Sequence, residues 1–566
     1  MTKYNFFILI IGTMLFFACK KTPKTITNNN NNTTTYVNNQ HISVLTQHND
    51  NTRAGLNNQE KVLTTANVNA KQFGKLFTLA VDDQVYAQPL VVGNLPVGSG
   101  IHNMVFIATV NNSVYAFDGD NGKLYWKQNF TISGMRPPIS QDMSSSWCTP
   151  YTDFAYNIGI VGTPVIDSVA KTMYFVARST DGANFVQYLH AINILTGAEQ
   201  AGSPVKIAAS VSGTGDGNIN GVVSFDPRRN NQRQGLTLVN GVVYISFSSH
   251  CDWNPYHGWI LGYNAATLQQ QTVYNVTPNG EEGGLWESGM GVAADPQGNL
   301  YVVSGNGTVG TKVPYTAPGN GTGENVSSSG PTDPSGRAES AMKLTPSGST
   351  LQISSYFTPT NYLDLNINDL DYGVMGTFLI PNSSFYLTGC KDGNLYLLNK
   401  DNMGGFSNTT NLVQQTVPLN VSLHCQPSYY LGATNEFVYV WSENDQLRTF
   451  LFNRSSNTLL STTFTSSDSG PVGGCGADLS VSSNGTLSGT GILWASYASS
   501  GDAGNTPSPG VLRAFDANNV NNELWNSDQN PGDNVGKYAK FSSPTIADGH
   551  VYLATFSGQV VVYGLK

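Results

Sequence analysis

The feature that most constrains the fold is an internal repeat of short strands. Three widely separated segments show it: VFIATVNNSVYAFDGDNGKLYW (105–126), MYFVARSTDGANFVQYLHAINILTGAE (173–199) and PTIADGHVYLATFSGQVVVYGL (544–565). In each segment apolar residues alternate along a strand, a turn follows, and a second strand begins. Alternation with a period of two buries one face of a strand. The repeat therefore predicts an array of similar small sheets.

Eight such units can be placed along the chain, each with four strands that we label A to D. They cover about 85–130, 160–207, 236–275, 289–358, 374–418, 425–465, 475–527 and 541–566. The eighth unit stops after its third strand, and a spare strand, FGKLFTLAV (73–81), precedes the first unit. Pairing the spare strand with the last unit closes a ring and removes the open edge of a linear array. The sequence predicts an all-β, eight-bladed β-propeller of four-stranded blades rather than an array of β-sandwiches.

Composition excludes two broad classes. The chain has 28 basic and 37 acidic residues among 566, a net charge of −9, and only 11% of its residues are charged. Nucleic-acid binding requires clustered Lys and Arg, so we expect no nucleic-acid partner. The chain also has 27 Tyr and 25 Phe residues, too many for an intrinsically disordered protein.

The N-terminus resembles a bacterial lipoprotein signal. Residues 1–18 contain Lys3 and a short apolar stretch, and they end LFFA before Cys19. The stretch is too short to span a bilayer comfortably. The resemblance implies lipidation of Cys19 and a cell-envelope location. The next residue, Lys20, is not the aspartate linked to inner-membrane retention, which favours the outer membrane. An ordinary secretory signal cleaved nearby is the alternative. Residues 19–40 are rich in Asn and Thr and predict a flexible tether, and the propeller occupies 41–566.

The repeat segment VYAFDGDNGKLYW resembles the repeats of pyrroloquinoline-quinone (PQQ) quinoproteins and of the propeller lipoprotein in the outer-membrane assembly machinery. Longer stretches resemble a bacterial group of PQQ-like proteins: QHNDNTRAG (47–55), GVVYISFSSHCDWNPYHGWILGYNAATLQQ (241–270), EEGGLWESGMGVAADPQGNLYVVSGNG (281–307) and NKDNMGGF (399–406). The resemblance covers most of residues 45–566. It implies the propeller fold, and it carries PQQ and Ca²⁺ as possible cofactors.

Long insertions are expected on one face of the ring. In a propeller the D–A and B–C connections emerge on one face, and the A–B and C–D turns on the other. The long segments 131–156, 208–234, 276–288, 359–371 and 526–540 are D–A connections, and 250–257, 306–336 and 500–510 are B–C connections. Because loops on a rigid scaffold carry most binding and catalytic groups, the sequence predicts the functional site on this face.

Some residues on this face match parts of a PQQ site. Such a site implies an aromatic floor, for which Trp286 is the candidate, and a nearby carboxylate, for which Glu287 is the candidate. The disulfide between adjacent cysteines found in many alcohol-oxidising members has no counterpart here, and there is no CxxCH haem motif. Glu282 and Glu287 also flank Trp286 as paired carboxylates, which glycoside chemistry uses. A structural acidic loop is the alternative.

Two further clusters are candidates for metals or catalysis. His250, Asp252 and His257 are possible transition-metal ligands, although the spacing matches no standard zinc pattern, and a packed aromatic loop is the favoured alternative. The run 364–371 alternates oxygen donors with apolar residues: Asp364, Asn366 and Asn368 are possible Ca²⁺ ligands, and Asp369 and Asp371 possible catalytic carboxylates. On a strand, the same alternation would only separate a polar face from an apolar face.

Five cysteines follow Cys19: Cys148, Cys251, Cys390, Cys425 and Cys475. An oxidising envelope permits disulfides, but an odd number leaves at least one thiol unpaired, and the pairing stays open. Near the N-terminus, Arg53 and Asp50 are expected to pair and to pin this segment to the ring.

Three functions remain. The first is a lipid-anchored binding or scaffold module whose loop-rich face binds a protein or glycan partner. The second is a PQQ-dependent envelope dehydrogenase. The third is a glycan-binding or glycan-active module. No complete catalytic set appears in the sequence, which favours the first.

Overall fold

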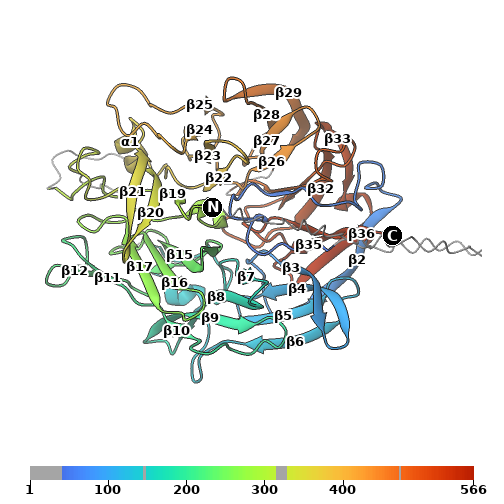
Figure 1. Cartoon of the computed structure of the whole chain (residues 1–566), viewed down its shortest axis with the longest axis horizontal. Helices are drawn as coiled ribbons and strands as arrows, with labels where there is room; N and C mark the ends of the chain where they lie inside the picture. The colour runs from blue at the N-terminus through green and yellow to red at the C-terminus, as the bar shows by residue number, and fades with distance from the viewer. Residues whose placement is uncertain (1–40, 145–147, 314–327, 471–472, 474) are drawn as a thin grey trace, which may run out of the picture. The chain divides into compact units, whose positions relative to one another are not determined.

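The computed structural model describes residues 41–144, 148–313, 328–470, 473 and 475–566. These residues belong to one compact unit that spans Gln40–Lys566. Eight four-stranded sheets follow one another around a ring, and their colours run from blue to red in chain order (Figure 1). The predicted eight-bladed propeller is therefore confirmed, with blade limits close to those expected from the repeat.

Each blade is an antiparallel sheet, and in blades 1 to 7 neighbouring strands are consecutive in the chain. Blade 1 contains β3 (Leu90–Val97), β4 (Gly100–Ala108), β5 (Ser113–Asp118) and β6 (Leu124–Asn129), and blade 2 contains β7 (Val165–Asp167), β8 (Thr172–Thr180), β9 (Phe185–Asn193) and β10 (Val205–Lys206). Blade 3 contains β14 (Thr237–Val239), β15 (Val242–Ser249), β16 (Trp259–Asn264) and β17 (Gln270–Asn275), and blade 4 contains β18 (Ala293–Ala294), β19 (Leu300–Val303), β20 (Ala341–Ser347) and β21 (Thr350–Phe357).

Blade 5 contains β22 (Thr377–Leu379), β23 (Phe385–Gly389), β24 (Asn394–Asn399) and β25 (Gln415–Pro418), and blade 6 contains β26 (Ser428–Leu431), β27 (Glu436–Val440), β28 (Gln446–Asn453) and β29 (Thr458–Ser469). Blade 7 contains β30 (Asp478–Ser482), β31 (Ile492–Ala498), β32 (Gly510–Asp516) and β33 (Asn519–Asn526), and blade 8 contains β34 (Thr545–Ala547), β35 (His550–Ala554), β36 (Gln559–Leu565) and β2 (Phe73–Ala80).

The ring is closed by β2, which completes blade 8. It pairs antiparallel with β36, from Phe73 opposite Leu565 to Ala80 opposite Gln559. Figure 1 shows the blue β2 lying beside the red β36. The ring of Phe73 packs against Trp494 and Trp525 of blade 7, with centroids 5.4 and 5.0 Å away, so the closing strand is also held by its neighbour. The predicted closure is confirmed, and the pairing leaves neither end of the ring open.

A segment that the repeat does not explain fills the centre of the ring. Residues 42–57, which we call the plug, make hydrogen bonds to the innermost strand of every blade. The pairs are Val44 with Val91 of β3, Leu45 with Ile166 of β7, Arg53 with Thr237 of β14, Asn51 with Ala294 of β18, Thr52 with Leu379 of β22, Ala54 with Tyr429 of β26, Gly55 with Val481 of β30, and Asn57 with Ile546 of β34.

The plug enters from the side of the A–B turns. The amide of Ile42 donates to the carboxylate of Asp548, in the A–B turn of blade 8. The chain then runs to Gln47, whose side chain contacts Gln426, a residue that precedes β26. It returns to the side of the A–B turns near Gln59, which forms a β-bridge with Asn484. We call the face of the A–B and C–D turns the base, and the opposite face, with the D–A and B–C connections, the chamber face.

Arg53 anchors the plug, though not through the expected pair. Its guanidinium is fully buried and donates to the carbonyls of Gln47, Leu236 and Val292 and to the hydroxyls of Thr46 and Thr237. The Asp50 carboxylate accepts instead from Thr52. Carbonyls of the ring thus solvate the cation, because the side chain points into the ring, away from the Asp50 turn.

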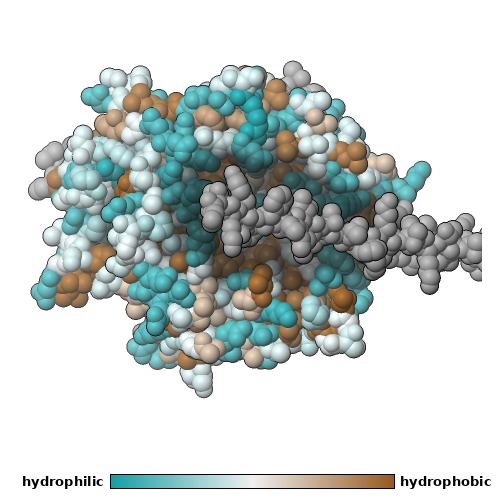
Figure 2. All heavy atoms as spheres, viewed as in Figure 1, coloured by the Kyte–Doolittle hydropathy of each residue, from teal (hydrophilic) through white to brown (hydrophobic). Residues whose placement is uncertain are grey.

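The remaining elements are short. They are β1 (Leu56–Asn57), β11 (Ser210–Ser212), β12 (Val222–Ser224), β13 (Asn230–Asn231), η1 (Ser140–Met143), η2 (Glu287–Gly289), α1 (Tyr362–Ile367), η3 (Ser527–Gln529) and η4 (Pro531–Asp533). Within the described ranges, no helix has the length and apolar character needed to cross a membrane. On the surface viewed in Figure 2, hydrophobic residues form separate patches among hydrophilic ones.

Candidate functional site

A cavity of about 500 Å³ lies on the chamber face, and we call it the chamber. Every residue that lines it belongs to a D–A or B–C connection, and all eight D–A connections contribute. The lining residues are Tyr86, Asp153, Phe154, Val161, Asn231, Arg233, Gly289, Asp369, Lys391, His424, Cys475, Gly504, Asn505, Lys540 and Phe541. Contributions from every blade place the chamber on the ring axis. The cavity lies on the face where the sequence analysis expected the functional site, although one C–D connection, 400–414, is also long.

The plug closes the chamber from below. Gln426 links the two: its amide donates to the carbonyls of Ser288 and Phe541 at the chamber floor, and its side-chain oxygen faces the Gln47 amide of the plug at 3.4 Å. Gly235 lies so close to Gln47 that a Cβ atom there would be 2.6 Å from the Gln47 Cβ. The plug and the residues that line the chamber floor are therefore in direct contact.

Two cations in the chamber have no carboxylate partner. Arg233 donates to the carbonyl of Trp286 at 3.0 Å, and Lys540 donates to the carbonyl of Gly504 at 2.5 Å. Neither forms an ion pair with any residue that the structure describes. Burial lowers the pKa of Arg233, and Asp153, which also lines the chamber, opposes this shift. Arg233 and Lys540 thus bring two positive charges to the chamber that no carboxylate of the described residues meets in an ion pair.

The third cation, Lys391, is neutralised by two carboxylates. Its ammonium lies 2.6 Å from Asp371 and 3.3 Å from Asp369. Although burial opposes it, these carboxylates raise the pKa of Lys391. Burial and Asp371 raise the pKa of Asp369. Two of the four carboxylates considered for catalysis, Asp369 and Asp371, thus lie together, paired with a lysine that the sequence analysis did not identify, and Asp369 lines the chamber.

Further buried acids surround this lysine. Burial, with repulsion from Asp371, raises the pKa of Asp252 to about 8, and the Tyr256 hydroxyl donates to it at 2.7 Å. Glu339 accepts from the amide of Tyr372 at 2.7 Å, and burial raises its pKa as well. Because charged carboxylates are costly in a buried cluster, burial disfavours the charged form of both acids and so opposes the build-up of negative charge around Lys391.

His424 has a buried nitrogen without a partner. Its ring lines the chamber and stacks on Phe541, with centroids 5.5 Å apart. Its Nε2 is buried and makes no hydrogen bond to the described residues. Burial, reinforced by Arg233, Lys391 and Lys540, lowers the pKa of this imidazole well below its usual value. Since buried polar atoms are normally satisfied, a neutral imidazole with an unused nitrogen points to a ligand or water in the chamber.

The expected aromatic floor, Trp286, lies beside the chamber rather than in it. The guanidinium of Arg233 sits between two rings, 5.2 Å from the centre of Trp286 and 4.9 Å from that of Phe541. Glu287 lies deeper, fully buried, with neither carboxylate oxygen hydrogen-bonded to the described residues. Burial raises the pKa of Glu287 to about 8, although Arg53 and Arg233 oppose the shift.

His250 and His257 do not share a partner, and each makes hydrogen bonds to the loops around it. His250 faces the Tyr151 hydroxyl at 2.8 Å and Arg178 at 3.0 Å. His257 faces the Thr277 hydroxyl and the Asp216 carbonyl, both at 2.9 Å. Glu282 accepts a hydrogen bond from the Asn254 side chain at 2.5 Å. The arrangement matches the packed aromatic loop.

The run 364–371 forms a helix and a turn, not a strand. Helix α1 (Tyr362–Ile367) buries Tyr362, Leu365 and Asn366, positions three and four residues apart, which is a helical spacing. Asn366 accepts from the amide of Gly307 at 2.7 Å, whereas Asp364 accepts from Asn368 at the exposed surface. The alternation that would have separated two faces of a strand is overridden by this packing.

The cysteines divide into one disulfide and three thiols. Cys148 and Cys251 are joined, although 103 residues separate them in the sequence. Cys390, Cys425 and Cys475 are free and buried. Cys475 alone among the three lines the chamber.

The residues expected to hold PQQ and Ca²⁺ do not assemble such a site. In the described ranges, no group of three or more His, Cys, Asp or Glu side chains is arranged to hold a metal ion. Arg233 occupies a face of Trp286 where a planar quinone would stack, and Asp369 and Asp371 are bonded to Lys391. We therefore derive no chemistry through this cofactor.

Comparison with solved structures identifies the fold. The quinohemoprotein alcohol dehydrogenase of Comamonas testosteroni is similar over 92% of this chain and 80% of its own, with a TM-score of 0.55 and 11% identity. This chain has the propeller fold of the quinoprotein alcohol dehydrogenases. The alcohol dehydrogenase ADHIIG of Pseudomonas putida HK5 covers the same shares, with a TM-score of 0.51 and 13% identity. BamB of Moraxella catarrhalis covers 87% of this chain and 99% of its own, with a TM-score of 0.46 and 11% identity.

No protein-family model matches the chain. No curated protein matches it either.

Sequence reasoning missed the residues that define the chamber. Arg233, His424 and Lys540 come from three different D–A connections, and Lys391 comes from a B–C turn. None lies in a motif, and only their common position in the repeat relates them. Aligning the D–A connections of the eight units would have selected the residues closest to the axis.

Proposed function

We propose that this protein is a binding module of the cell envelope whose chamber takes a small organic anion. The observation that carries the proposal is the pair Arg233 and Lys540, which face the chamber without a carboxylate partner. A buried cation is stable when its charge is met, and an anionic ligand would meet it. The unused Nε2 of His424 supplies a further polar contact in the same space.

The other lining residues narrow the ligand class. Asp153 and Asp369 offer acceptors, while Tyr86, Phe154 and Phe541 offer apolar walls. A compact anion that also carries hydrogen-bond donors, such as a hydroxy acid or a sugar acid, matches this mixture. A volume of about 500 Å³ is typical of small-molecule sites. It favours such a ligand over a protein partner or an extended glycan on the loop-rich face.

The proposal is tested with the purified mature protein and a panel of anions: citrate, D-glucuronate, L-lactate, inorganic phosphate and PQQ with Ca²⁺. Thermal unfolding and calorimetry measure binding, and a dye-coupled assay measures alcohol oxidation. We expect at least one organic anion to raise the melting temperature saturably. We expect Arg233→Gln and Lys540→Gln each to weaken its binding at least tenfold, and Arg454→Gln, on the outside of blade 6, to leave it unchanged.

Two results would contradict the proposal. One is binding that survives both chamber substitutions, which would place the anion elsewhere. The other is the absence of binding by every organic anion in the panel. Alcohol turnover with PQQ and Ca²⁺ would establish the dehydrogenase alternative instead.

A further inference from the structure

Two residues that line the chamber are close together on one D–A connection. Asn231 ends β13, Arg233 follows two residues later, and both line the chamber. Gln232 lies between them and donates its side-chain amide to the Gln234 carbonyl at 2.5 Å. Residues two apart in an extended segment share a side and lie roughly 7 Å apart. A ligand group bound by Asn231 would therefore lie next to the anionic group bound by Arg233.

The side-chain amide of Asn231 has a fixed polarity. Its oxygen accepts a hydrogen bond from the Arg178 guanidinium at 2.7 Å. A guanidinium carries only donors, so the amide cannot turn its nitrogen toward Arg178 without losing this bond. Within the described ranges the amide nitrogen makes no hydrogen bond, although Asn231 lines the chamber. With its oxygen held by Arg178, Asn231 presents a hydrogen-bond donor to the chamber.

Arg178 is itself fixed by neighbours that accept hydrogen bonds. It belongs to β8, is fully buried, and also donates to the Gln232 carbonyl at 2.9 Å and to Nε2 of His250 at 3.0 Å. Burial, reinforced by Arg178 and Arg233, lowers the pKa of His250 well below its usual value, so the imidazole is neutral. Because Nε2 accepts, the ring proton lies on Nδ1, which faces the Tyr151 hydroxyl at 2.8 Å. Three hydrogen bonds thus hold the guanidinium in place.

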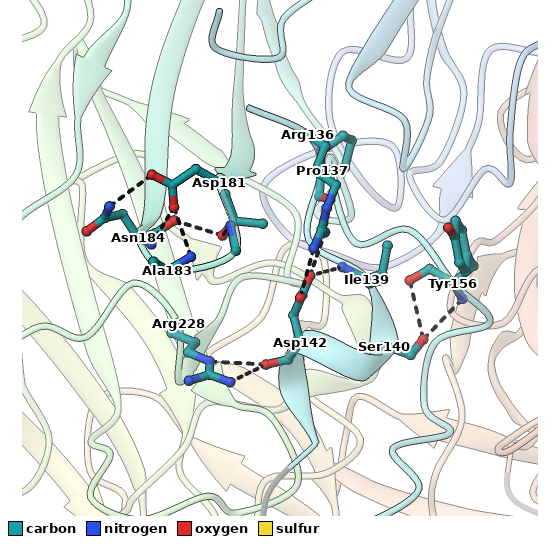
Figure 3. A network of polar contacts seen from close by, with 12 residues as sticks. Arg136, Pro137, Ile139, Ser140, Asp142, Tyr156, Asp181, Ala183, Asn184 and Arg228 are labelled. Carbon is teal, nitrogen blue, oxygen red and sulfur yellow. Dashed lines mark hydrogen bonds and ion pairs between the residues drawn. The ribbon is translucent and has the colours of Figure 1, made fainter. Parts of the chain in front are cut away.

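The connection that carries Asn231 is also bonded to the preceding D–A connection. Arg228, three residues before Asn231, donates twice to the Asp142 carbonyl, at 3.0 and 2.7 Å (Figure 3). The Asp142 carboxylate forms a bidentate ion pair with Arg136, at 2.6 and 2.9 Å. A binding residue discriminates between similar ligands when its neighbours lock its orientation in this way.

We propose that Asn231 determines which acids the chamber takes, by donating to an oxygen on the carbon next to the carboxylate that Arg233 binds. The ligands favoured are 2-oxo and 2-hydroxy acids over the same acids without that oxygen. Arg178 is a positioning residue: it acts through Asn231 and does not touch the ligand. The inference rests on the proposed function, because the carboxylate has to be bound before the neighbouring oxygen can be recognised.

The test is calorimetry on the purified mature protein with L-lactate, pyruvate and propionate, which differ only at the carbon next to the carboxylate. We expect lactate and pyruvate to bind the wild type about three- to tenfold more tightly than propionate, the effect of one neutral hydrogen bond. Arg233→Gln should weaken the binding of all three acids.

Asn231→Asp separates recognition from folding. The new carboxylate still accepts from Arg178, and it gives this buried cation a charged partner, so the melting temperature should not fall. It presents no donor to the chamber, so the preference over propionate should shrink to less than about twofold. Asn129→Asp adds the same charge at an exposed position of β6 and should leave the preference unchanged.

Arg178 is tested by a matched pair of substitutions. Arg178→Gln can both donate and accept, so it no longer fixes the Asn231 amide, and the preference over propionate should fall. Arg178→Lys carries only donors and should restore the preference. A merely structural role for Arg178 would lower the melting temperature of Arg178→Gln and leave the preference as it is.

Three outcomes would overturn the inference. Equal binding of the three acids by the wild type would leave anion binding in place and remove the role of Asn231. A preference that survives in Asn231→Asp would assign recognition to another residue. If none of the three acids binds, the inference falls, and the citrate and D-glucuronate measurements then show whether the proposed function falls with it.

Discussion

Arg53 allows a sharp test of the plug. The residue lies at the centre of the ring, fully buried, and its guanidinium is surrounded by main-chain carbonyls and threonine hydroxyls from the plug and from blades 3 and 4. Arg53→Met keeps most of the apolar stem and removes the charged group. We expect this single substitution to destabilise the ring because the guanidinium joins the plug to blades 3 and 4 at once.

The cost follows from the acceptors that are left behind. The Leu236 and Val292 carbonyls keep the hydroxyls of Thr46 and Thr237 as donors, at 3.0 and 2.7 Å. The Gln47 carbonyl loses the donor that Arg53 supplies at 2.7 Å. An unsatisfied buried acceptor costs about 1–3 kcal/mol, and a lost charge-assisted bond about 1.5–3 kcal/mol. Because removal of the cation also removes its desolvation penalty, we expect a net loss of about 1–3 kcal/mol in the free energy of unfolding, which is the cost of the unsatisfied Gln47 carbonyl.

The assay is urea unfolding followed by tryptophan fluorescence, with Arg454→Met as the matched control. Arg454, in the C–D turn of blade 6, pairs with Glu436 and donates to the Pro381 and Asn382 carbonyls. It is 39% exposed, so its loss should change stability by less than about 1 kcal/mol. A second readout is Glu287, whose carboxyl loses a nearby cation in Arg53→Met, so its pKa should rise above about 8. If Arg53→Met unfolds within about 1 kcal/mol of the wild type, the plug does not depend on this cation.

Three other perturbations test separate parts of the structure. Burial raises the pKa of Asp478 from 3.8 to about 7, so the protonated carboxyl contributes to folding stability below about pH 4. This contribution is lost as the pH rises through 7. The melting temperature of Asp478→Asn should therefore fall less over this pH range than that of the wild type. Leu79→Ala empties a buried position on β2 and should cost about 2–5 kcal/mol, measured by urea unfolding, whereas Leu76→Ala at a partly exposed position of the same strand should cost far less. Asp548→Ala removes the acceptor of the Ile42 amide and should speed limited proteolysis near residue 42 without cleavage within the blades; an unchanged digestion pattern would show that this contact does not hold the segment.

Much of the fold was predictable because it depends on local patterns of apolar residues along the sequence. The alternation in 105–126, 173–199 and 544–565 identifies strands, and the count of strands identifies the blades. The spare strand at 73–81 and the missing strand at the C-terminus predict the closure that β2 and β36 make. The same register also locates the long connections on one face, where the chamber lies.

The plug was not predictable in this way. Residues 42–57 show no repeating hydrophobic pattern. Successive residues of the plug bond to different blades rather than to one neighbouring strand. The helix α1 was missed for a related reason: the period-two pattern of 364–371 competes with burial of Tyr362 and Leu365, which only the packing of blades 4 and 5 reveals. The disulfide between Cys148 and Cys251 joins two loops whose approach depends on ring curvature.

By itself, then, the sequence determined the number of blades, the way the ring closes and the face that carries the long connections and the chamber, since all three follow from the order of short-range elements along the chain. Only the tertiary structure decided the chemistry of the site. Arg233, Lys391, His424 and Lys540 are far apart in sequence and meet because each lies at the axial end of its blade. Their charges, burial and unpaired atoms arise from being brought together on the axis, where side chains from all blades share one water-poor space.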